Sequence, residues 1–66
     1  MNITLNGQDT TLDAPLTLAE LIERHKLTPT RVAIEVNEQL VRRAEFADRQ
    51  LKPGDRVEIV TLVGGG

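Results

Sequence analysis

The fold is decided near the start of the chain, by the stretch Asn2-Ile3-Thr4-Leu5-Asn6-Gly7. Residues 2–5 alternate between polar and apolar side chains, which is typical of a half-buried strand. Asn-Gly is the preferred pair for a type I′ hairpin turn, because both central residues of that turn need a positive φ. Residues 8–12 include two threonines and a leucine, which favour a returning strand. The sequence therefore predicts an N-terminal β-hairpin.

A helix is predicted after this hairpin. Thr17-Leu18-Ala19-Glu20 matches a capping box, in which the threonine caps the first turn and the glutamate bonds back to the threonine amide. Leu18, Leu21 and Ile22 are spaced i, i+3 and i+4, so they form one apolar stripe. We expect this stripe to face the core.

Three further strands are predicted, at residues 32–36, 40–42 and 56–63. Between the last two, residues 43–50 are predicted to form a loop with a helical turn, anchored by Phe46 and Leu51. Residues 52–55 read Lys-Pro-Gly-Asp, a strong turn signal. A hairpin, one helix and further strands predict an α+β fold, with a mixed sheet of four to five strands and the helix packed on one face.

Composition limits the function further. The 66 residues contain no cysteine and one histidine, which excludes disulfides, thiolate metal sites, a cysteine nucleophile and a multi-histidine metal site. A net charge of −2 and a single aromatic residue argue against a nucleic-acid partner. Because neither a signal-peptide pattern nor a membrane-length apolar run is visible, we expect a cytoplasmic protein with no membrane partner.

The last three residues are Gly64, Gly65 and Gly66, which follow an alternating strand. Glycine is a poor residue for finishing a folded element, since it has no side chain to pack and loses much conformational freedom on ordering. We therefore expect a domain at residues 1–63 and a flexible tail at 64–66. Such a tail can enter a narrow active-site channel of a partner. The alternative is a disordered end or a remnant of expression.

Taken together, these patterns resemble the β-grasp, ubiquitin-like fold, and within it the ThiS family of sulfur carriers in thiamine biosynthesis. The resemblance covers the whole chain and rests on five stretches: Ile3-Thr4-Leu5-Asn6-Gly7, Thr17-Leu18-Ala19-Glu20-Leu21-Ile22, Val32-Ala33-Ile34-Glu35-Val36-Asn37, Pro53-Gly54-Asp55-Arg56-Val57-Glu58-Ile59-Val60 and Val63-Gly64-Gly65-Gly66. Two departures are visible. Glu38 stands where the family usually has glycine, which predicts a looser loop than a tight I′ turn. Val41-Arg42-Arg43 replaces the Val-Pro-Arg that is often found.

The resemblance implies that the chain is not an enzyme but a substrate of partner enzymes, with no catalytic residue, bound cofactor or metal of its own. A ThiF-like adenylating enzyme, related to ubiquitin-activating enzymes, would use ATP and Mg²⁺ to adenylate Gly66. Sulfur derived indirectly from a cysteine desulfurase would convert the adenylate to a thiocarboxylate (1-thioglycine). A ThiG-like thiazole synthase would then receive the sulfur.

Alternation along the last predicted strand places Val60 and Leu62 on the face turned away from the helix. Exposed apolar residues beside a functional tail suggest a docking surface for a partner. Cover by the chain's own loop, or by a second copy of the chain, is an equal alternative. His25 and Lys26 are interpreted as residues of the last helical turn, where positive charge is favourable.

Several functions share the activation chemistry of such a tail. A sulfur carrier for tRNA thiolation or molybdopterin is one alternative to the thiamine carrier. A ubiquitin-like modifier joined to lysines through Gly66 is another. A third is an interaction module whose tail has no chemical role.

Overall fold

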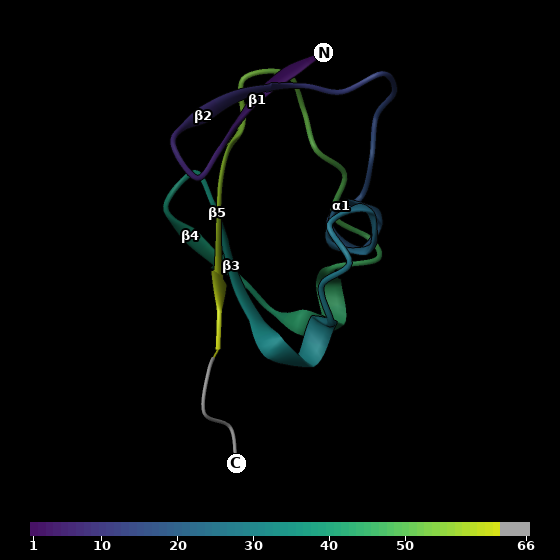
Figure 1. Cartoon of the computed structure of the whole chain (residues 1–66), viewed down its shortest axis with the longest axis vertical. Helices are drawn as coiled ribbons and strands as arrows, with labels where there is room; N and C mark the ends of the chain where they lie inside the picture. The colour runs from purple at the N-terminus through teal and green to yellow at the C-terminus, as the bar shows by residue number, and fades with distance from the viewer. Residues whose placement is uncertain (63–66) are drawn as a thin grey trace.

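The computed structural model of the protein describes residues 1–62, which form a five-stranded sheet with a helix lying across one face (Figure 1). The strands are β1 (Asn2–Leu5), β2 (Gln8–Thr11), β3 (Val32–Val36), β4 (Gln39–Val41) and β5 (Arg56–Thr61). The helix α1 spans Leu18–Arg24, and two 3₁₀ turns, η1 and η2, span Pro29–Arg31 and Arg43–Glu45. The predicted α+β fold is confirmed.

The strands are ordered β2-β1-β5-β3-β4, so the last strand of the chain lies in the centre of the sheet. It runs parallel to β1 on one side and antiparallel to β3 on the other. The two hairpins β1–β2 and β3–β4 flank it and form the outer parts of the sheet. This arrangement gives β5 a bonded neighbour on each side.

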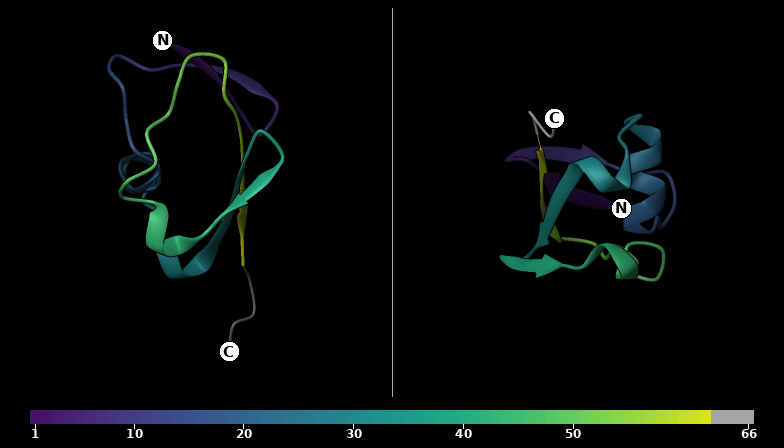
Figure 2. Two further views of the ribbon diagram at one scale, coloured as in Figure 1. Left: turned by 180° about the vertical axis from the view of Figure 1, so that it is seen from behind. Right: turned by 90° about the horizontal axis from the view of Figure 1, so that it is seen from below.

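Helix α1 lies against one face of the sheet (Figure 2). The core residues come from the strands, from α1 and from the loops that join them. Leu18, Leu21 and Ile22 are fully buried, as the helical spacing predicts. The following residues complete the core: Ile3, Leu12, Leu16, Val32, Ile34, Val36, Val41, Phe46, Leu51 and Val57. The predicted anchoring of the long loop is therefore confirmed, because Phe46 and Leu51 are both in this core.

Both ends of α1 follow from local sequence. The predicted capping box is present, with the Glu20 amide donating to Thr17 Oγ1 at 3.2 Å and the Thr17 amide donating to Glu20 Oε1 at 2.9 Å. The helix ends at Arg24, so the placement of His25 and Lys26 within its last turn is wrong. His25 is the C-cap and Lys26 takes a positive φ of 58°, a conformation that reverses the chain after many helices.

The turn between β3 and β4 differs from the expectation of a looser loop. Asn37 and Glu38 have φ values of 52° and 70°, and Val36 pairs directly with Gln39, so the turn is a tight two-residue one. Contacts from a distant part of the chain hold this geometry. Asn37 Nδ2 donates to Asp55 Oδ1 at 3.0 Å, and the Arg56 amide donates to Asn37 Oδ1 at 2.9 Å.

Glu38→Gly should therefore stabilise the protein. A non-glycine residue in the left-handed region costs about 1 kcal/mol, and glycine removes this cost. We expect a rise of about that size in the free energy of unfolding, measured by urea denaturation. Glu38→Ala is the matched control, since it removes the same side chain but keeps the strain, and it should bring no gain. A fall in stability for Glu38→Gly would show that the exposed ion pair between Glu38 and Arg56 matters more than the strain.

Candidate functional site

The candidate site is built on β5, the strand that leads into the glycine tail. Its register with β3 runs from Val36–Val57 to Val32–Thr61. The Leu62 amide then donates to the carbonyl of Arg31 at 2.7 Å, one residue past the strand. The strand was predicted to continue to residue 63. It ends at Thr61, and Val63 and the predicted tail residues Gly64, Gly65 and Gly66 lie outside the described residues.

Beyond the end of β1, a side chain from the first turn makes the hydrogen bonds to β5 that a longer strand would make. β1 pairs with β5 at Thr4 and Leu5. Beyond them, Asn6 Oδ1 accepts from the Ile59 amide at 2.7 Å, and Asn6 Nδ2 donates to the Ile59 carbonyl at 3.3 Å. Both hydrogen-bonding groups of Ile59 are thereby satisfied. Asn6 thus fixes β5 three residues before the described part of the chain ends.

Asp55 fixes the other end of the strand. Its carboxylate is buried and accepts from the Lys52 amide at 2.9 Å and from Asn37 Nδ2 at 3.0 Å. Within residues 1–62, every buried side-chain nitrogen and oxygen has a hydrogen-bond partner. The polar groups around β5 are therefore structural, and they hold the strand rigidly at both ends.

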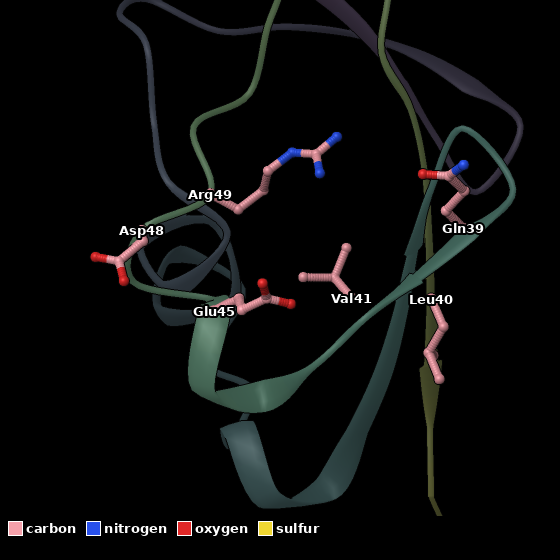
Figure 3. A pocket seen from close by; sticks show the side chains of 6 residues that line it. All are labelled: Gln39, Leu40, Val41, Glu45, Asp48 and Arg49. Carbon is pink, nitrogen blue, oxygen red and sulfur yellow. The ribbon is translucent and has the colours of Figure 1, made fainter.

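An apolar surface lies beside the tail-bearing end of β5. Val60 is 58% exposed and Leu62 is 51% exposed, as the alternation along the strand predicts, so neither residue belongs to the core. Leu40 on β4 is 69% exposed and was not predicted as part of this surface. In Figure 3 it points away from Val41, which turns toward η2. We call Leu40, Val60 and Leu62 the apolar patch.

A further hollow lies beside β4. Its volume is about 350 Å³, and its lining includes Val41, Glu45 and Arg49. In Figure 3 the side chains of Glu45 and Arg49 extend from the segment after β4 toward that strand. Among residues 1–62, no cluster of three or more histidine, aspartate or glutamate side chains is suited to a metal ion. The same residues contain no helix that is long and apolar enough to span a bilayer.

Comparison with known proteins assigns the family. The model of the ThiS family matches residues 3–66. The chain belongs to the ThiS family. A crystal structure of the thiamine biosynthesis protein ThiS from Geobacter metallireducens is similar over the full length of both chains, with a TM-score of 0.85 and 35% sequence identity. The β-grasp architecture that the sequence suggested is thus the ThiS fold.

Two relatives connect the ThiS family to sulfur transfer and to thiazole formation. The chain is 38% identical over 64 residues to the sulfur carrier protein ThiS of Thermus thermophilus, covering 97% of this chain and 98% of that protein. It is 30% identical over 66 residues to a thiazole synthase of Paramagnetospirillum magneticum. The match covers all of this chain but spans only 20% of the length of that synthase. These similarities support a ThiS-type sulfur carrier of thiamine biosynthesis.

Proposed function

We propose that this ThiS-family carrier transports sulfur as a thiocarboxylate on Gly66 and delivers it for synthesis of the thiamine thiazole ring. One structural observation supports the proposal most directly. The central strand of the sheet is bonded on both sides, and in the sequence it is followed closely by three glycines. A rigid strand gives a partner a fixed point of attachment, and residues without side chains can pass through a narrow channel.

The proposed chemistry needs a partner enzyme. A carboxylate resists nucleophilic attack, so its oxygen first attacks the α-phosphate of ATP, which releases pyrophosphate and leaves an acyl-adenylate. A sulfur nucleophile, supplied indirectly by a cysteine desulfurase, then displaces AMP. The chain has no cysteine, and its described residues contain no group of three or more side chains that could bind a metal ion. In this proposal a ThiF-like adenylating enzyme in the cytoplasm supplies ATP and Mg²⁺, and this chain is its substrate.

The apolar patch is the proposed docking surface for that enzyme. Val60→Asp should raise the KM of adenylation about tenfold, because it places a charge where apolar contact is needed. The free energy of unfolding should fall by no more than about 1 kcal/mol, because the side chain is exposed but aspartate is less favourable than valine in a strand. Steady-state release of pyrophosphate and urea denaturation measure the two effects.

Ala47→Asp is the matched control for this substitution. Ala47 is also exposed and apolar but lies in the loop after η2, away from β5. We expect its KM to equal that of the unmodified chain. If Val60→Asp leaves the KM of adenylation unchanged in a folded domain, the docking role is wrong.

The proposed recipient of the sulfur is a ThiG-like thiazole synthase. The similarity of the whole chain to one fifth of a thiazole synthase supports this choice, because covalently joined domains often act on one another. The test is a strain that lacks the gene for this chain. Growth restored by thiazole or thiamine supports the proposal. Growth that neither compound restores, together with loss of thiolated tRNA, would assign the carrier to tRNA thiolation.

A further inference from the structure

The open face of the sheet carries two glutamates that repel one another. Glu35 on β3 and Glu58 on β5 are direct cross-strand partners, and both are exposed. Like charges directly opposite one another destabilise a sheet. Within residues 1–62 the observed ion pair joins Arg56 to Glu38 at 2.7 Å. The Arg56 guanidinium therefore already has a carboxylate partner. Glu35 and Glu58 have no ion-pair partner within residues 1–62.

A shallow hollow of about 330 Å³ lies beside these glutamates. Ala33 forms its half-buried floor, and Val60 is the direct cross-strand partner of Ala33. Leu40 is the cross-strand partner of Glu35 on the other side of β3. The hollow therefore combines apolar side chains from two strands with carboxylates. The lining residues are Ala33, Glu35, Glu38, Leu40, Glu58 and Val60.

We propose that this hollow receives an arginine side chain from the ThiF-like enzyme, an inference that rests on the proposed carrier function. The aliphatic part of the arginine lies over Ala33 between Leu40 and Val60. Its guanidinium reaches the carboxylates of Glu35 and Glu58. Long cationic side chains commonly bury their apolar stems while the charged group finds a polar partner. Arginine suits a pair of carboxylates because its planar group presents several donors at once.

The position of the hollow connects this contact to the tail. Val60 lies two residues before Leu62, where the last described backbone hydrogen bond anchors the chain to Arg31. An enzyme side chain bound at this hollow would therefore hold the base of the tail. A second copy of this chain is a poor occupant, since the chain has a net charge of −2 and would bring further carboxylates to the same face.

Calorimetric binding of the full chain to the ThiF-like enzyme, at low and moderate salt, tests this inference. Glu58→Lys and Glu35→Lys should each weaken binding about tenfold and reduce its dependence on salt. Glu45→Lys is the matched control, because it makes the same charge change at an exposed glutamate outside this hollow. Its affinity should equal that of the unmodified chain. Unchanged affinity in both hollow variants would overturn the inference.

Two further measurements separate a binding role from a structural one. Glu58→Gln should raise the melting temperature, because it removes the repulsion from Glu35, and should still weaken binding. The unmodified chain should protect an arginine of the enzyme from phenylglyoxal, whereas Glu58→Lys should not. Protection of a lysine from acetylation, with no arginine protected, would contradict the choice of arginine.

Different results would contradict this inference and the carrier proposal. If the unmodified chain is bound and thiolated but the glutamate substitutions have no effect, the inference alone is wrong. If the cognate enzyme neither binds nor thiolates the unmodified chain, the carrier proposal is wrong and the inference falls with it.

Discussion

Deletion of Gly65 and Gly66 should abolish formation of the thiocarboxylate while leaving the fold intact. The shortened tail would no longer place a terminal carboxylate at the proper distance from the domain. It would also lack the segment that enters the active site of the enzyme. The core residues all lie before residue 58, and the last described backbone hydrogen bond is made by Leu62, so folding should not depend on the deleted residues. Thiolation is measured by mass spectrometry and folding by thermal denaturation.

Gly65→Ala is the control for this deletion, because it keeps the length of the tail and its carboxylate. We expect slower adenylation, because the added methyl group must pass through a narrow channel. The thiocarboxylate product should still be detectable. Growth without added thiamine by a strain that carries only the truncated chain, with no thiocarboxylate detected, would show that the tail has no chemical role. The domain would then be an interaction module.

Ile34→Ala should have the largest effect on stability. Ile34 is fully buried on β3, between β4 and β5. Truncation of a buried isoleucine costs about 3 kcal/mol, because it removes apolar contacts and leaves a cavity. A domain of 66 residues is stable by only about 3–10 kcal/mol, so this loss is a large part of the total. Urea denaturation measures the change in the free energy of unfolding.

Leu40→Ala is the matched control, since it also shortens a branched aliphatic side chain but at a residue that is 69% exposed. Its effect on stability should be within about 0.5 kcal/mol. Its effect on adenylation should instead be a higher KM, because Leu40 lies in the proposed docking surface. Equal destabilisation by the two substitutions would contradict the division of the sheet into a core face and a docking face.

The parts of the fold that sequence predicted are those specified by local chemistry. The Asn6-Gly7 turn has two positive φ values, and its direct Leu5–Gln8 pairing makes it the tight hairpin that this dipeptide favours. The capping box and the apolar stripe of α1 are likewise encoded within a few residues. For these elements the local preference and the tertiary packing agree.

The features that sequence missed depend on residues far apart in the chain. The turn at Glu38 is held because Asn37 donates to Asp55 and accepts from the Arg56 amide, 18 and 19 residues later in the chain. Asn6 forms hydrogen bonds with Ile59, which lies 53 residues later in the chain. The Asn-Gly turn is by itself a sufficient reason for an asparagine at position 6, so the sequence does not indicate this second role. The pairing of Glu35 with Glu58 requires the strand order and register. β4 has only three residues, too few for alternation to assign Leu40 to a face.

The proposed function depends on Gly66 carrying sulfur as a thiocarboxylate. The most direct test is intact-protein mass spectrometry of the chain after incubation with ATP, Mg²⁺, the ThiF-like enzyme and a sulfur source. We expect a mass increase that corresponds to replacement of one oxygen by sulfur, located at Gly66 by fragmentation. Absence of that product, with an enzyme shown to form the acyl-adenylate of this chain and an active sulfur source, would contradict it.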